Sequence, residues 1–77
     1  MRPRDMAIRF QIHALRRMRR RGISKEQVER AIRNGKKGKA KRPNSVKFTL
    51  RISAKTTIVV ITEELERAIW AVTAWRK

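Results

Sequence analysis

The spacing of apolar residues changes once along this chain, and that change limits the folds open to it. Over residues 11–21, Ala14, Leu15 and Met18 recur at the spacing that places them on one stripe of an α-helix. Gly22 follows directly, at the position where a residue in the left-handed conformation commonly ends a helix. The pattern therefore predicts a first helix over 11–21.

A second helix is predicted immediately after the first. Ser24 and Gln27 have the spacing of a capping box, in which the two side chains satisfy backbone N–H groups at the start of a helix. Ile23 precedes this cap and Val28 follows it, so the two side chains can pack together as a hydrophobic staple. The apolar face ends at Asn34-Gly35, where we expect the helix to stop.

Strict alternation of apolar and polar residues replaces the helical spacing over 46–53, which predicts a strand with one buried face. A second, β-branched strand is predicted over 57–62 and a third over 67–75. A stretch at Ala7 to Phe10 offers an optional short strand at an edge. These elements predict an α+β fold in which two N-terminal helices pack on a three-stranded antiparallel sheet.

Length and charge narrow the class of protein further. A chain of 77 residues has room for one small domain, predicted here as 1–77 with residues 1–5 as a tail. Its 22 Lys and Arg against 6 Asp and Glu give a formal charge of +16, for which a polyanion is the default partner. Residues 1–42 hold 16 basic and 3 acidic residues, and residues 43–77 hold 6 and 3, so the first half is expected to make most contacts.

The most biased segment is 34–45, where lysine and arginine are interleaved with glycine and proline. This composition predicts a mobile basic loop that attracts nucleic acid through release of counterions, without specificity for its base sequence. Lys36, Lys37 and Lys39 are its candidate contacts to phosphate groups.

Several classes of site are not expected. The chain has no cysteine and one histidine, so neither a disulfide framework nor a metal centre is predicted. No cofactor is expected, because GKKGK lacks the spacing and the following helix of a nucleotide-binding phosphate loop. No apolar run approaches the roughly 18 residues that span a bilayer, and the first ten residues include the charged Arg2, Arg4, Asp5 and Arg9 where a signal peptide needs an apolar stretch. We therefore expect a cytoplasmic protein without a membrane segment.

The predicted first helix carries five arginines, which are Arg16, Arg17, Arg19, Arg20 and Arg21. Neighbouring like charges on a helix repel, so contact with phosphate groups is expected to compensate them. Arg16, Arg20 and Arg21 are accordingly candidate nucleic-acid ligands.

His13 shares the face of this helix that lies opposite its apolar stripe. An imidazole beside arginine side chains can accept the proton of a ribose 2′-hydroxyl while arginine neutralises charge on the attacked phosphate. An exposed histidine without any catalytic role fits the same position. The spacing of the residues leaves both interpretations open.

Trp70 and Trp75 differ in parity along the third predicted strand and are expected to face opposite sides of the sheet. If Trp70 lies in the core, Trp75 stands outside it beside Arg51 and Arg76, where it could stack on a base. Packing over the sheet edge, or against a protein partner, is the favoured alternative for Trp75.

The run His13 to Ser24, HALRRMRRRGIS, resembles the signature His-Ala-x-x-Arg-Met-x-x-Arg-Gly-Ile-Ser of a family of short prokaryotic domains of unassigned function. This family is similar in layout to the RelE-like toxins and their BrnT relatives, which are small basic ribonucleases held inactive by paired antitoxins. The resemblance implies a RelE-like fold over most of the chain. It also implies RNA as the partner, including ribosome-bound mRNA, together with an acidic antitoxin protein.

The same resemblance implies a toxin that acts as a metal-independent endoribonuclease, with attack by the 2′-hydroxyl and a cyclic phosphate product. His13 and Arg17 are the residues it assigns to proton transfer and phosphate contact. Arg51 and Arg76, from the predicted sheet, are assigned to support of the transition state.

A non-enzymatic DNA- or RNA-binding module is the competing hypothesis. The turn at Gly22 joins two helices, somewhat as in a helix-turn-helix, and such a pair reads bases from its second helix. The second helix offers Gln27, Arg30 and Arg33, which are fewer candidate contacts than the arginines of the first helix. The sequence therefore favours the ribonuclease and keeps the binding module as its alternative.

Overall fold

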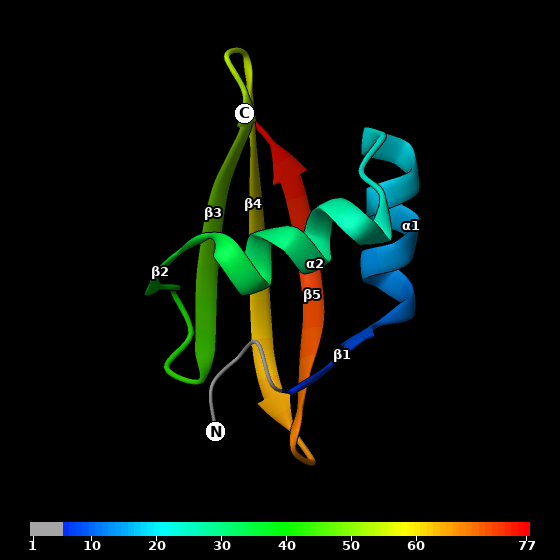
Figure 1. The fold of residues 1–77 in the computed structure, drawn as a ribbon. Coiled ribbons are helices and arrows are strands. Elements are labelled where there is room, and N and C mark those ends of the chain that lie inside the picture. The colour runs from blue at the N-terminus through cyan, green and yellow to red at the C-terminus, as the bar shows by residue number, and fades with distance from the viewer. Residues whose placement is uncertain (1–5) are drawn as a thin grey trace.

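The computed structural model describes residues 6–77, and the predicted tail at 1–5 lies outside this range. Two helices and five strands follow one another along the described chain (Figure 1). In order they are β1 (Ala7–Phe10), α1 (Ile12–Arg21), α2 (Lys25–Asn34), β2 (Lys36–Lys39), β3 (Ser45–Ser53), β4 (Thr56–Leu65) and β5 (Ala68–Arg76). The strands form one sheet in the order β1-β5-β4-β3-β2, with β1 parallel to β5 and all other neighbours antiparallel.

The predicted three-stranded antiparallel sheet is therefore wrong, because the sheet is mixed and has five strands. The optional edge strand predicted at Ala7 to Phe10 is present as β1, which is parallel to β5, with Ala7 opposite Ala68 and Phe10 opposite Ala71. Strand β2 adds the other edge, and its sequence, KKGK, has no apolar side chain that could signal a strand. Backbone hydrogen bonding to β3 holds β2, whereas β1 is also held by Ile8 and Phe10, which pack against the core.

Both helices start and stop within one residue of their predicted ends. Helix α1 ends at Gly22, whose φ of 67° is left-handed, and the N–H of Ile23 donates to the oxygen of Met18 at 2.9 Å. At the start of α2, the N–H of Gln27 donates to Ser24 Oγ at 3.1 Å, and the N–H of Ser24 donates to Gln27 Oε1 at 3.0 Å. The predicted capping box is confirmed.

Gly35 lets the chain pass from α2 straight into β2. A Cβ atom at this position would meet the main-chain oxygen of Ala31 and, at 2.8 Å, that of Thr49. Because both obstacles are backbone atoms, only a glycine allows the approach that sets Lys36 opposite Thr49. The prediction of a loop across 34–45 is consequently wrong for Lys36–Lys39.

The hydrophobic core lies between the helices and one face of the sheet. Helix α2 crosses β3 and β4, whereas α1 packs along β5 (Figure 1). The buried side chains of this core are Met6, Met18, Ile23, Val28, Ala31, Ile32, Phe48, Ile58, Val60, Ile69, Ala71 and Ala74. Each large aliphatic side chain that is fully buried stabilises the fold by about 1.5–3 kcal/mol.

A β-bulge turns both tryptophans toward the same face of the sheet. Strand β5 has one residue more than β4 at Val72, where the register shifts. On either side of it, Trp70 pairs with Glu63 and Trp75 pairs with Val59, and these two β4 partners point the same way because they are four residues apart. The predicted opposite orientation of the tryptophans is wrong, because parity along a strand is lost at a bulge.

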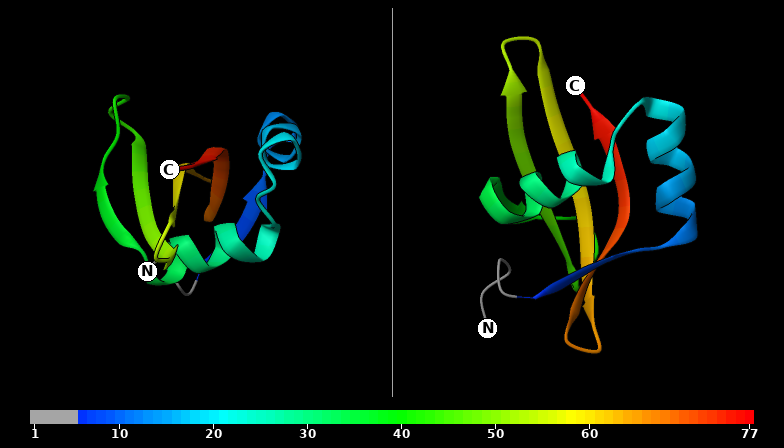
Figure 2. Two further views of the ribbon diagram at one scale, coloured as in Figure 1. Left: turned by 90° about the horizontal axis from the view of Figure 1, so that it is seen from above. Right: turned by 45° about the vertical axis from the view of Figure 1, so that its right-hand side comes forward.

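The second face of the sheet is left open by the helices. Seen from above, α2 lies beneath the sheet, while α1 and the β2–β3 connection rise on either side of the opposite face (Figure 2, left). The polar residues that alternate with the core positions of β3, and both tryptophans, therefore lie on a surface that has a wall on each side.

Candidate nucleic-acid interface

The open face holds a groove with a volume of about 520 Å³, called the basic groove below. Its lining residues are Arg17, Lys39, Ala40, Lys41, Arg42, Ser45, Lys47, Ile61, Glu63, Val72, Thr73 and Trp75. Arg17 comes from α1, residues 39–42 come from the β2–β3 connection, and the others come from β3, β4 and β5. Five cations and one carboxylate thus surround a floor that is partly apolar.

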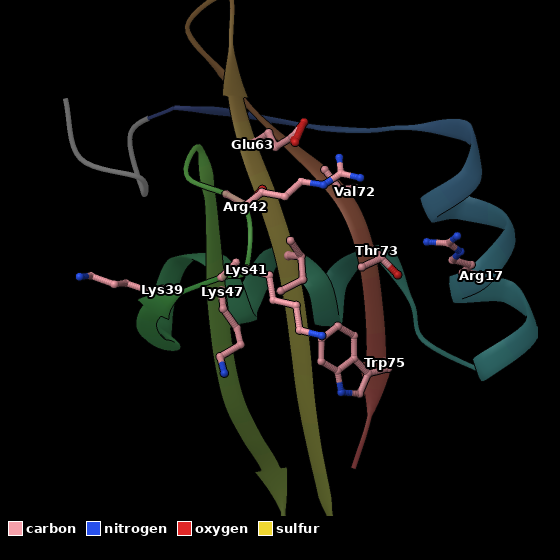
Figure 3. A pocket seen from close by; sticks show the side chains of 12 residues that line it. Arg17, Lys39, Lys41, Arg42, Lys47, Glu63, Val72, Thr73 and Trp75 are labelled. Atoms are coloured by element: carbon pink, nitrogen blue, oxygen red, sulfur yellow. The ribbon is translucent and has the colours of Figure 1, made fainter.

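Basic side chains reach over this face from both walls (Figure 3). Arg17 points from α1 toward the sheet, and Arg42 extends from the opposite side toward Val72. Lys41 extends toward Trp75, whereas Lys39 points away from the sheet. The cationic groups of Arg17, Lys41 and Arg42 are therefore positioned along the sides of the groove, which suits the phosphate groups of a strand lying on its floor.

The floor offers surfaces on which bases can stack. Ile61, Val72 and Trp75 line it, and the indole of Trp75 is half-buried. Aromatic rings combined with cations are the usual platform for single-stranded nucleic acid, because every base presents a π-face.

The position of Arg17 depends on how α1 is fixed to the sheet. Ala14 and Met18 are buried against the rest of the fold, which sets the rotation of the helix. At its last turn, Arg21 Nη1 donates to the oxygen of Ala74 at 2.7 Å, and Arg76 Nη1 donates to the oxygen of Arg21 at 3.3 Å. Because Arg17 lies one turn before Arg21, these bonds hold it at the edge of the groove.

His13 lies one further turn toward the start of α1 and is exposed. Since residues four apart share a helix face, His13 lies on the same side of α1 as Arg17. Of these two residues, only Arg17 lines the basic groove. The predicted base and the predicted phosphate ligand therefore share one side of α1.

Arg51 and Arg76 both lie away from His13. Arg51 bends over its own hairpin, donating from Nε to the oxygen of Ser53 at 3.3 Å and from Nη2 to the oxygen of Ala54 at 2.8 Å. Arg76 contacts the end of α1, eight residues or about 12 Å of helix beyond His13. The four predicted catalytic residues thus do not form one cluster.

The predicted nucleic-acid ligands are divided between the groove and the outer surface. Lys39 and Trp75 line the groove, whereas Arg16, Arg20, Lys36 and Lys37 are exposed outside it, and Arg21 is exposed and bonded to β5. Lys41, Arg42, Lys47, Ser45 and Glu63 were not predicted as site residues. Lys47 carried a signal in the sequence, since it alternates with the core residue Phe48, and Lys41 and Arg42 belong to the basic segment 34–45 that was expected to attract nucleic acid. Ser45 and Glu63 are brought to the groove only by strand pairing.

Neither metal ligands nor a membrane helix are found in the part of the chain that the structure describes. Within residues 6–77, no three His, Cys, Asp or Glu side chains lie together as they would around a metal ion. Neither of the helices in this range has the length and apolar character needed to cross a bilayer.

Comparison with known proteins gives one match. No curated protein matches the chain, and no solved structure matches it. Residues 10–76, which include α1, α2 and β2–β5, match a family described as a domain of unknown function. On the strength of that match, which extends over nearly all of the sequence, the chain belongs to the DUF4258 family.

Proposed function

We propose that this protein binds single-stranded RNA in the basic groove and cleaves it as a metal-independent endoribonuclease. The observation that carries the proposal is the groove itself, where Arg17, Arg42 and Lys41 border a floor that includes Trp75. A row of cations along an aromatic and aliphatic floor matches the two chemical parts of a nucleotide strand, its phosphates and its bases.

Cleavage is assigned to the pair His13 and Arg17. The imidazole of His13 accepts the proton of a ribose 2′-hydroxyl, and the 2′-oxygen attacks the adjacent phosphorus. The bond to the 5′-oxygen breaks, water supplies a proton to that leaving group, and the products are a 2′,3′-cyclic phosphate and a 5′-hydroxyl. The Arg17 guanidinium neutralises the charge that grows on the phosphate oxygens during the attack.

The wider role that we propose is that of a toxin in a toxin–antitoxin pair, acting in the cytoplasm on RNA that includes ribosome-bound mRNA. A formal charge of +16 on 77 residues supports an acidic protein partner, since a complementary negative chain would cover such a surface. The His13–Ser24 run resembles the signature of a family that is similar in layout to RelE-like and BrnT-like toxins, which points the same way.

A second candidate function is binding of RNA or DNA without cleavage. It is favoured by the hydrogen bonds of Arg51 and Arg76, whose guanidinium groups donate to main-chain oxygens away from His13. On this alternative, Arg17 contributes affinity and His13 is a bystander on the helix surface.

Cleavage of a mixed RNA pool by purified protein in EDTA distinguishes the two functions. The wild-type protein is expected to leave cyclic phosphate ends, and His13→Ala is expected to slow cleavage by about 10²–10⁴-fold while RNA still binds. Arg17→Ala should reduce both cleavage and binding. Arg19→Ala is the matched control, because Arg19 borders a separate surface hollow with Ile12 and Ile23, away from the basic groove.

The two functions predict different results for intact RNA. If the wild-type protein and His13→Ala shift the RNA equally in a gel and neither cuts it, the binding module is supported and the ribonuclease is not. If RNA is cut equally by both proteins, His13 is not the base.

A further inference from the structure

We propose that the Glu63 end of the basic groove is a base-recognition subsite that selects guanine. This inference rests on the proposed binding of single-stranded RNA and adds a sequence preference to it. Its basis is one cross-strand row on the open face, in which Ser45 of β3, Glu63 of β4 and Trp70 of β5 lie next to one another in register.

Glu63 is the single carboxylate among the residues that line the groove, and its side chain is half-buried. Within the described range 6–77 its carboxylate makes neither a hydrogen bond nor an ion pair, although Arg42 and Lys47 line the same groove. An acceptor group left free in a strongly cationic setting has its full hydrogen-bonding capacity available to a ligand.

The side-chain polar atoms of the two neighbours of Glu63 in the row also lack hydrogen-bond partners within residues 6–77. Ser45 is only 7% exposed and lines the groove, yet its Oγ is unpaired there, as is the buried Nε1 of Trp70. Buried polar atoms are nearly always paired, so an unpaired hydroxyl in the wall of a groove points to a ligand that pairs it. A serine hydroxyl turns readily between staggered rotamers and can be redirected toward the groove.

Guanine is the base whose hydrogen-bonding edge fits this row. Its N1–H and its exocyclic N2 amine donate side by side, and a carboxylate accepts both at once. The adjacent O6 is an acceptor, which the hydroxyl of Ser45 can satisfy as a donor. Adenine, cytosine and uracil each present one donor group on this edge, and the unstacked bases of a single strand leave the edge free to be read.

The surroundings of Glu63 suit the rest of a nucleotide. Ile61 and Val72 line the floor next to it and offer an apolar surface under the base. Arg42 extends across the same place and can contact the attached phosphate (Figure 3). The strand position of Trp75, opposite Val59, lies four residues or about 13 Å along β4 from Glu63, so the indole is free to stack on a different base.

Binding of short oligonucleotides by fluorescence anisotropy tests the subsite. The probes are dye-labelled heptamers of 2′-O-methyl uridine whose central base is guanine, hypoxanthine or adenine, because the methyl group prevents 2′-hydroxyl attack. Hypoxanthine is the matched control, since it differs from guanine only by the missing N2 amine. The wild-type protein is expected to bind the guanine probe at least about fivefold more tightly than the other two.

Glu63→Gln is expected to reduce this preference to less than about twofold while the probes still bind. Glu64→Gln removes the same charge from the next residue, which pairs with Ile69 and points to the other face, and should keep the wild-type preference. Circular dichroism melting of both variants tests that they fold alike.

The outcomes separate the subsite from the function on which it rests. Equal affinity of the wild-type protein for all three probes would overturn the guanine subsite and leave the RNA-binding proposal standing. Loss of preference in Glu64→Gln as well would also overturn it, since the effect would then be one of charge alone. Failure of every probe to bind would reject the proposed function and the subsite together.

Discussion

Arg21 Nη1 donates a hydrogen bond of 2.7 Å to the main-chain oxygen of Ala74, and this bond joins the last turn of α1 to β5 across 53 positions of sequence. Arg21 was predicted as a nucleic-acid ligand, yet its guanidinium contributes to the wall of the groove by positioning the helix. Since α1 carries both His13 and Arg17, any proposed chemistry of this protein depends on that contact.

Replacement of Arg21 by alanine is expected to lower the free energy of unfolding by about 1–3 kcal/mol, because the Ala74 oxygen loses a charged donor. Arg20→Ala is the matched control, since it removes the same charge from an exposed neighbour and should change stability by less than about 0.5 kcal/mol. Urea denaturation followed by circular dichroism measures both. Equal stability of the two variants would contradict the anchoring role of Arg21.

Gly35→Ala is expected to destabilise the fold by about 1–3 kcal/mol or more, because the new methyl group meets the backbone oxygens of Ala31 and Thr49. Gly38→Ala is the matched control in the same basic segment, where an added Cβ meets only Lys47, with Cε at 3.9 Å. Thermal melting should separate the two variants by several degrees. Similar melting temperatures would mean that β2 does not require the close approach at Gly35.

Arg17→Ala is expected to weaken the salt dependence of RNA binding, because one phosphate contact is lost. For single strands the slope of log K against log salt should fall in magnitude by about 0.7. Arg19→Ala, on the other side of α1, should leave the slope within experimental error of the wild-type value. Titrations of an oligouridine at several potassium chloride concentrations give the slope, and identical slopes for both variants would remove Arg17 from the interface.

Trp75→Ala is expected to weaken binding of single-stranded RNA by about 5- to 100-fold, as removal of a stacking platform does. Trp75→Phe keeps an aromatic face and should retain most of the affinity. The intrinsic fluorescence of the wild-type protein should be quenched when RNA binds, and quenching that persists fully in Trp75→Phe would have to come from Trp70 instead. Unchanged affinity of Trp75→Ala at equal thermal stability would argue against stacking.

Local chemistry in the sequence determined the helices and the three long strands. The Ser24–Gln27 capping box and the left-handed Gly22 are settled by residues within one or two turns, so their signals are complete in a short window. The alternation over 46–53 likewise identified β3, observed as Ser45–Ser53. The excess of positive charge also follows from the sequence alone, because it is obtained by counting the charged residues.

Strand β2 and the bulge were decided only by the tertiary structure. Strand β1 occupies the residues of the optional edge strand at Ala7 to Phe10, whereas β2 has no apolar side chain and owes its conformation to hydrogen bonds to β3. The bulge at Val72 depends on how β5 pairs with β4, and it turns Trp70 toward the same face as Trp75. The alternation of side chains along a single strand gives no sign of a bulge, because a bulge depends on the partner strand.

Most of the candidate site, like β2 and the bulge, was decided only by the tertiary structure. The sequence by itself determined that Arg17 and His13 share a helix face, because both belong to one local element. Only the pairing of β2 with β3, and the anchoring of α1 on β5, placed Arg42 opposite Arg17, with Glu63 at one end of the groove. The groove is formed by segments that are far apart in the sequence, and they come together only through long-range packing and strand pairing.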